Sequence, residues 1–151
     1  MSNVERTGWR DEWISRRHRE WGLPCSALDI DFLLIEYRNG EPKALIEYKH
    51  HFAEIQDPKK PSYKALIKLG NCADIPVFGV RYDNNDDKNP QFTITPLNNK
   101  AKDFIINPNK NGRIVLNERD YVKLLYKIRG YDDSFSEQYL PGNKGSDVNV
   151  N

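Results

Sequence analysis

Two apolar segments separated by a short polar turn constrain the fold of this chain most strongly. Residues 27–37 and 43–49 are rich in β-branched, aliphatic and aromatic side chains, and Arg-Asn-Gly at 38–40 lies between them. This pattern is typical of a β-hairpin. Both predicted strands also contain charged side chains, which are costly in an apolar strand unless they have partners or a metal. We therefore expect a functional site on the hairpin. The charged residues are Asp29, Asp31, Glu47 and Lys49.

The register of the hairpin decides whether these side chains meet, because a slip of one residue moves a whole strand's side chains to the other face. A three-residue loop at 38–40 places Asp31 opposite Glu47 and Asp29 opposite Lys49, all on one face. In a two-residue turn, Asp31 instead faces the residue after Glu47, and Glu47 points to the other side. The sequence leaves both registers open, and we favour the first partly because it makes a site.

The chemistry of this set gives its spacing a reason. Carboxylates bind hard divalent cations through their oxygens, and an ammonium beside them orients or deprotonates a water. The expected target of such a site is a phosphodiester.

Asp31, followed across a hairpin by Glu47-Tyr48-Lys49, resembles the Asp…(Asp/Glu)-x-Lys signature of the PD-(D/E)XK nuclease superfamily. The resemblance covers roughly residues 7–83. It implies an α/β, restriction-endonuclease-like core, a central mixed β-sheet flanked by helices in the order αβββαβ. The first of the three strands would be short and lie between Leu23 and Leu28. Leucine or isoleucine, and not proline, precedes each of the two aspartates.

The resemblance implies a metal-dependent nuclease that hydrolyses phosphodiester bonds of DNA, with Asp31, Glu47 and Lys49 as catalytic residues. Asp31, Glu47 and the main-chain carbonyl of Tyr48 would bind Mg²⁺ or Mn²⁺, and Asp29 would assist or hold a second ion. Lys49 would position or activate the attacking water, and cleavage would leave a 5′-phosphate and a 3′-hydroxyl.

A glutamate on the first helix sometimes completes the metal site in this superfamily, which makes Glu12 and Glu20 candidates. Each of them also lies four residues from Arg16, and an ion pair within the helix is the simpler interpretation.

Positive charge is local in this chain, whose formal net charge is only +1. Lys60, Lys64 and Lys68 recur at four-residue spacing, as on one stripe of a helix, and Arg16 and Arg17 belong to a basic run near the start. Both groups are candidates for binding nucleic-acid phosphates. A solvated helix face explains them as well.

The chain of 151 residues fits a single domain over 1–140, followed by a polar tail over 141–151 that we expect to be disordered. Cys25 and Cys72 are too few for a zinc site or a disulfide framework, and neither a membrane-spanning stretch nor a signal peptide is evident. We expect a reduced, cytoplasmic protein with DNA as its partner, no membrane association and a possible homodimer. The alternative is a catalytically silent nuclease-fold module that binds nucleic acid or a protein partner.

Further elements follow from local signals. The first helix should begin near Thr7 or Gly8 and carry Trp9, Trp13, Ile14 and Trp21 toward the core. We also predict a helix over 61–73, strands over 77–82 and 91–95, and a helix after an Asn117 N-cap that ends at Gly130.

Overall fold

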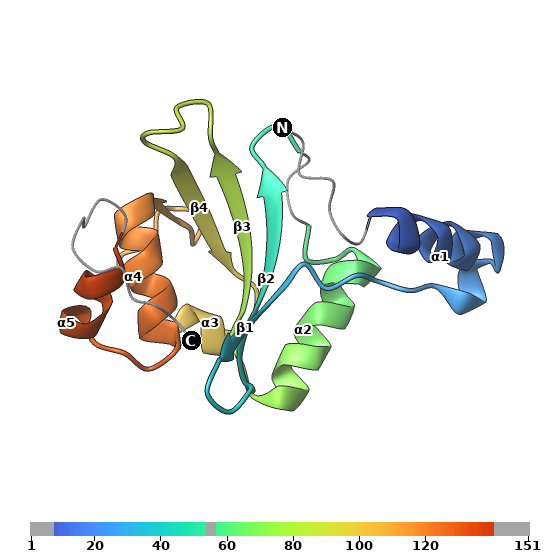
Figure 1. Cartoon of the computed structure of the whole chain (residues 1–151), viewed down its shortest axis with the longest axis horizontal. Helices are drawn as coiled ribbons and strands as arrows, with labels where there is room; N and C mark the ends of the chain where they lie inside the picture. Colours follow the sequence, from blue (N-terminus) through green and yellow to red (C-terminus); the bar gives the residue numbers. More distant parts are fainter. Residues whose placement is uncertain (1–7, 54–56, 141–151) are drawn as a thin grey trace.

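The computed structural model describes residues 8–53 and 57–140, with side chains from residue 13 onward. A five-stranded mixed sheet in the order β1-β2-β3-β4-β5 forms its centre, with α2 on one face and α4 on the other (Figure 1). The α/β class, with a mixed sheet flanked by helices, is confirmed. The strands are β1 (Phe32–Glu36), β2 (Glu41–His50), β3 (Val77–Asp83), β4 (Gln91–Pro96) and β5 (Ile114–Asn117). The helices are α1 (Gly8–Glu20), η1 (Leu23–Cys25), α2 (Pro61–Ala73), α3 (Asn99–Lys102), α4 (Glu118–Ile128), α5 (Asp133–Ser136) and η2 (Glu137–Tyr139).

The strand β2 divides the core into two layers. It pairs antiparallel with β1 and parallel with β3, and α2 makes the crossover that a parallel pair requires. Ala44 and Ile46 pack in the cluster that includes α4, whereas Leu45 packs in the cluster that includes α2. Successive β2 side chains therefore alternate between two apolar layers, and the face of each functional residue follows from its position in this alternation.

Helix α2 begins and ends as its sequence predicts. Pro61 occupies its first turn, and Tyr63 and Leu66 are buried against the sheet. Gly70 is buried as well, and a Cβ added there would lie 2.2 Å from Cγ2 of Val77. The close approach of α2 to β3 therefore depends on glycine at this position.

Helix α4 and its cap are confirmed. The Asn117 side chain accepts a hydrogen bond of 2.8 Å from the backbone N–H of Asp120. The apolar stripe of α4 packs on the sheet, and Gly130 takes a left-handed conformation just past the helix.

The N-terminal part of the expected strand arrangement is wrong. The strand predicted over 27–37 extends only over Phe32–Glu36, and Leu23–Cys25 forms a short 3₁₀ turn where a first strand was expected. Pro24 favours this turn because its φ is fixed and it has no N–H for a strand ladder. In the described part of the chain the elements before β3 therefore follow the order αββα, without the first strand of a three-strand meander.

Helix α1 occurs where it was predicted, but its expected packing is wrong. Trp13, Ile14 and Trp21 are 51%, 39% and 51% exposed, and α1 stands apart from the sheet (Figure 1). Charged side chains interrupt its apolar positions on every side, so the helix has no continuous apolar stripe with which to pack. The Trp9 side chain lies outside the described residues.

The two cysteines of the chain, Cys25 and Cys72, are both free. No helix in the described ranges is long and apolar enough to span a bilayer. The tail 141–151 lies outside the described residues. The strand predicted over 91–95 lies between β3 and β5, a position that the sequence had not indicated.

Candidate active site

The hairpin has the register that brings Asp31 level with Glu47. Phe32 pairs with Ile46, and Leu33 with Leu45, so the next pair toward the N-terminus of β1 is Asp31 with Glu47. This is the first of the two registers that the sequence left open. Asp31 itself precedes β1, and its Oδ2 accepts a hydrogen bond of 3.2 Å from the backbone N–H of Tyr48. A carboxylate therefore continues the hydrogen bonding of β2 where the β1 backbone leaves the sheet.

The turn reaches this register by a different route from the one expected. The loop has four residues, 37–40, and Glu36 pairs with Glu41. The register then shifts between Leu34 and Ile35 because β2 contains one extra residue there. Gly40 has the expected positive φ of 71°. Loop and bulge together give the register that a three-residue loop alone would have given.

Glu47 and Lys49 form the centre of the site. They lie two residues apart on β2, on the face covered by α2, and Nζ of Lys49 is 3.1 Å from Oε1 of Glu47. The Glu47 side chain is only 11% exposed, whereas that of Lys49 is 40% exposed. An ammonium at the rim of the site therefore neutralises a carboxylate beneath it.

The electrostatics of the pair reflect its surroundings. Burial raises the pKa of Glu47 above its usual range, the hydrogen bond from Lys49 opposes this rise, and the neighbouring Asp31 carboxylate adds to it. The hydrogen bond to Glu47 raises the pKa of Lys49. Lys49 therefore carries its charge at neutral pH, and the close pair of carboxylates favours a bound cation.

The hollow above this pair has a volume of about 390 Å³ and is bounded by the first turn of α2. Lys60 and Ser62 come from that turn, and Tyr63 follows them and interacts electrostatically with Lys49. Leu28 closes another side of the hollow. The sequence analysis had singled out Lys60 among these residues, but not Ser62, Tyr63 or Leu28. The Pro61 helix start was the signal that could have indicated which α2 residues reach the site.

A further residue that sequence reasoning missed is Arg81, which lies beside Lys49 in the β2–β3 register. Its guanidinium donates hydrogen bonds to the carbonyl oxygens of His51 and Ala53. Ala53 is itself part of the lining of the hollow. Arg81 therefore holds the start of the β2–α2 connection against the sheet beside the site.

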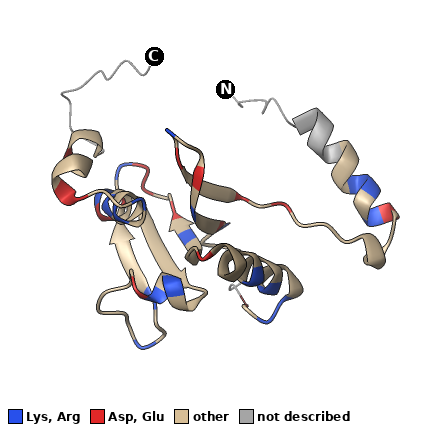
Figure 2. Cartoon of the chain, turned by 90° about the horizontal axis from the view of Figure 1, so that it is seen from below, with Lys and Arg blue, Asp and Glu red and all other residues tan. Residues whose placement is uncertain are grey.

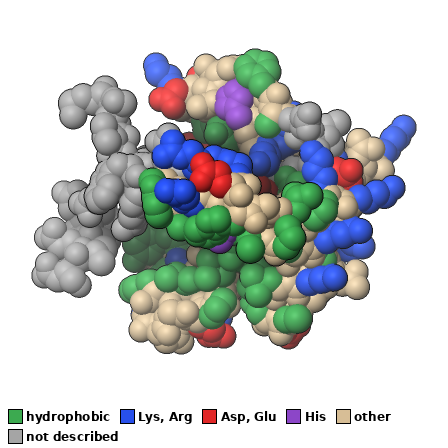
Figure 3. Space-filling view, turned by 90° about the vertical axis from the view of Figure 1, so that its right-hand side faces the viewer, with side chains coloured by type: hydrophobic (Ala, Val, Ile, Leu, Met, Phe, Trp, Pro, Cys, Tyr) green, Lys and Arg blue, Asp and Glu red, His purple; other side chains and the backbone are tan. Residues whose placement is uncertain are grey.

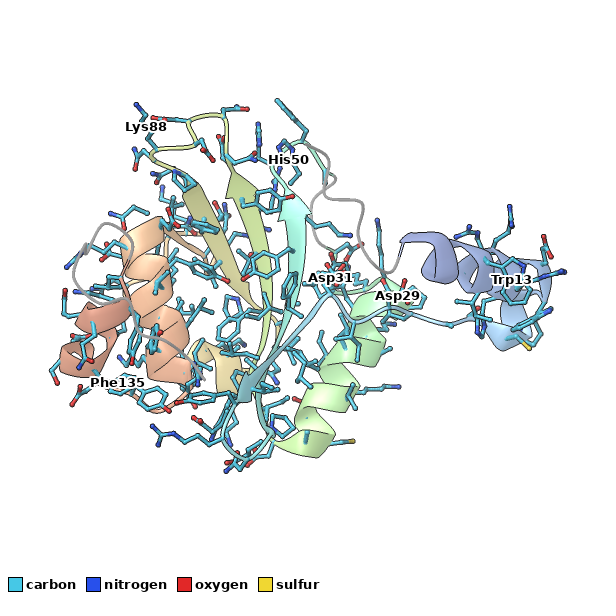
Figure 4. The ribbon with its side chains drawn as sticks, viewed as in Figure 1. Trp13, Asp29, Asp31, His50, Lys88 and Phe135 are labelled. Atoms are coloured by element: carbon cyan, nitrogen blue, oxygen red, sulfur yellow. The ribbon has the colours of Figure 1, made fainter. Side chains whose placement is uncertain are left out.

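The other candidate acids lie differently. Asp29 precedes β1 and lines a separate hollow beside α1, whereas Asp31 acts electrostatically on both Glu47 and Lys49. Figure 4 shows Asp29 and Asp31 in the segment that leads from α1 to β1. Glu20 pairs with Arg17 at 3.3 Å on α1, and not with Arg16 as expected. The Glu12 side chain lies outside the described residues.

The Tyr48 side chain points to the face of the sheet opposite to Glu47 and Lys49. Its hydroxyl is hydrogen-bonded to that of Tyr121 on α4, and its ring packs edge-on against Phe32 with centroids 4.9 Å apart. This packing fixes the β2 backbone between Glu47 and Lys49. The Tyr48 carbonyl lies on β2 between Glu47 and Lys49.

The basic residues are distributed over two elements. Lys60 lines the hollow, and Lys64 and Lys68 are exposed one and two turns further along α2. Arg16 and Arg17 are exposed on α1. Figure 2 shows these charges along both helices, and the structure joins only Lys60 directly to the site.

The donor set fits a hard cation in chemical type. Asp31 and Glu47 offer carboxylate oxygens next to the Tyr48 main chain, which are the ligand types that Mg²⁺ and Mn²⁺ prefer. Within residues 8–53 and 57–140, no three His, Cys, Asp or Glu side chains are grouped so that they alone could hold a metal ion. Water and substrate oxygens would therefore have to supply the remaining ligands, as is usual for Mg²⁺.

Comparison of the chain with models of protein families, with curated proteins and with solved structures finds no match.

Proposed function

We propose that this protein is a metal-dependent nuclease of the PD-(D/E)XK type that hydrolyses phosphodiester bonds of DNA. The observation that carries the proposal is the Lys49–Glu47 pair at 3.1 Å with Asp31 beside it. A hairpin that buries aliphatic side chains elsewhere accommodates two carboxylates and a lysine at one point. Two carboxylates beside one ammonium leave a negative charge that a bound cation would balance.

In this proposal Asp31, Glu47 and the Tyr48 carbonyl hold Mg²⁺ or Mn²⁺. When bound, the ion supplies Lewis-acid stabilisation of the charge that develops on the phosphate oxygens. The oxygen of a water forms the new bond to phosphorus and gives up a proton to solvent, the bond to the 3′ oxygen breaks, and the leaving 3′ oxygen takes up a proton from solvent.

We assign Lys49 to hold the attacking water and a phosphate oxygen by hydrogen bonds, because its ammonium lies at the rim of the hollow, 3.1 Å from Oε1 of Glu47. Lys60 at the start of α2 lies on the other side of the hollow and would contact an adjacent phosphate.

The test is incubation of the purified full-length protein with supercoiled plasmid, linear duplex and single-stranded DNA, with Mg²⁺, with Mn²⁺ or with EDTA. We expect metal-dependent cleavage that Lys49→Ala and Glu47→Ala abolish. Lys43→Ala is the matched control, because Lys43 pairs at 3.2 Å with Glu41 at the same spacing on β2, away from the hollow.

Calorimetric titration with Mn²⁺ separates chemistry from metal binding. Lys49→Ala should bind Mn²⁺ and fail to cleave, whereas Asp31→Asn should lose both. Folded Lys49→Ala protein that cleaves at the wild-type rate contradicts the assignment. A folded wild-type protein that neither binds Mn²⁺ nor cleaves any substrate supports the alternative, a silent binding module.

A further inference from the structure

All three tryptophans of the chain lie in one segment, at positions 9, 13 and 21. The described ones, Trp13 and Trp21, are each about half exposed on or just after α1. Tryptophan usually contributes to a core or an interface because of its large apolar surface. Its concentration here, outside the core, indicates a binding role for this helix.

Helix α1 is held as an arm. Residues 21–31, which include η1, connect it to β1, and the helix stands apart from the sheet in both Figure 1 and Figure 2. Ile14 and His18 of α1 line a hollow of about 490 Å³ that Asp29 also lines. The connection from the arm to β1 therefore carries both Asp29 and Asp31, and it links α1 to the candidate active site.

Helix α1 carries arginines as well as exposed indole rings. The Arg17 guanidinium lies 5.1 Å from the centre of the Trp13 ring, and Arg16 and Arg19 are exposed on the same helix. The His18 ring supports Trp21 edge-on, with centroids 4.8 Å apart. Figure 3 shows the face of the molecule on the α1 side, where Lys and Arg side chains are interspersed with hydrophobic ones.

We propose that α1 is a stacking arm for single-stranded nucleic acid. Unpaired bases would stack on Trp13 and Trp21, and the phosphates between them would pair with Arg16, Arg17 and Arg19. This inference deepens the proposed nuclease function and rests on it. A nucleic acid whose unpaired end or flap is bound on α1 would have its neighbouring phosphates directed to the site at Asp31.

The charge of the arm argues for this occupant. An apolar protein partner, or a second copy of this chain, would have to desolvate three arginines in order to cover the tryptophans. A polyanion neutralises the same arginines. Duplex DNA offers the phosphates but hides the faces of its bases within the stack, whereas a single strand offers both.

The test measures binding separately from cleavage. Full-length Lys49→Ala protein in EDTA is titrated with oligothymidylate or oligouridylate of about 12 nucleotides, within the range that single-strand-binding domains cover. A blunt duplex of equal length serves as the competitor. Because no tryptophan occurs outside positions 9–21, tryptophan fluorescence reports on α1 and the residue just after it.

We expect the single strand to quench the fluorescence and to bind more tightly than the duplex. Trp13→Ala should weaken single-strand binding by roughly 5- to 100-fold, as expected for one stacked base, and Trp13→Phe should restore part of the affinity. Ile106→Ala, which removes an exposed apolar side chain outside α1, should leave affinity unchanged. Comparison of the thymidylate and uridylate arms decides between DNA and RNA.

The proposal that α1 binds single strands is overturned if duplex and single strand bind with equal affinity, or if a folded Trp13→Ala protein binds with wild-type affinity. It is also overturned by a dimer in sedimentation that Trp13→Ala converts to a monomer, because the tryptophans then cover a second copy. Cleavage without tryptophan-dependent binding refutes only the proposed binding by α1. Tryptophan-dependent binding without any cleavage refutes only the proposed nuclease activity.

Discussion

Replacing Lys49 by Met should destabilise the fold by an amount that depends on pH. The substitution keeps an unbranched side chain of similar length but removes the ammonium 3.1 Å from Glu47, whose side chain is almost buried. Breaking a buried pair costs about 3–5 kcal/mol, and breaking an exposed one under about 1 kcal/mol. Since Lys49 is 40% exposed and solvent screens it, we expect a loss of about 1–2 kcal/mol at neutral pH.

The direction of the pKa shift of Glu47 sets the pH dependence. A carboxyl whose pKa is higher in the fold than in the unfolded chain favours the fold in its protonated form. The stabilisation by the protonated Glu47 carboxyl is fully present below the pKa of a glutamate in the unfolded chain, about 4.3. It is lost as the pH rises through the pKa of Glu47 in the folded protein. Removing Lys49 raises the folded pKa of Glu47 further. The loss of free energy of unfolding caused by Lys49→Met should therefore be largest at neutral pH and become smaller as the pH falls toward 4.

Urea unfolding at pH 7 and pH 4 measures this deficit as a difference in free energy of unfolding. Glu47→Gln and the double variant complete a cycle that isolates the pair. The control is Lys43→Met, because Lys43 lies 3.2 Å from Glu41 on the same strand but Glu41 is 59% exposed. We expect it to cost less than about 0.5 kcal/mol. Equal losses for the two lysines, or a Lys49→Met deficit unchanged between the two pH values, would refute the reasoning.

Three further substitutions test the packing that positions the site. Gly70→Ala places a Cβ 2.2 Å from Val77 Cγ2 and should lower the free energy of unfolding by about 1–3 kcal/mol, as measured by thermal or urea unfolding. Val77→Ala should partly restore it. A Gly70→Ala protein as stable as the wild type means that α2 does not approach β3 this closely. Asn98→Ala removes a buried side chain that makes four hydrogen bonds to described groups and should cost about 2–4 kcal/mol, against under about 0.5 kcal/mol for the exposed Asn99→Ala. Tyr121→Phe deprives the Tyr48 hydroxyl of its partner and should cost about 1–2 kcal/mol; an unchanged unfolding midpoint would show that this hydroxyl pair contributes nothing net.

Much of the local structure could be predicted because its signals are short-range. The signals for these elements are the apolar run of β2, the Pro61 start of α2 and the Asn117 cap of α4, and each depends on residues close together in the chain. The same holds for the spacing of Glu47 and Lys49, since a strand places residues two apart on one face. Their pairing with each other therefore follows from β2 alone.

The start of the sheet was predicted less well because its signals conflict. Residues 27–31 have strand-forming side chains, yet the backbone leaves the sheet before Phe32 and Asp31 hydrogen-bonds to β2 through its carboxylate. The four-residue loop and the bulge in β2 compensate each other. Each alone would shift the register by one residue, and no local rule links them.

The sequence by itself determined the helices α1, α2 and α4, the central strands, and the presence of two carboxylates and a lysine on one hairpin, because periodicity and capping act between near neighbours. Only the tertiary structure decided which acids meet, that the first turn of α2 closes the hollow over Glu47 and Lys49, and that α1 leaves its tryptophans exposed. These features depend on register and on the competition of distant surfaces for burial, which is a property of the whole chain.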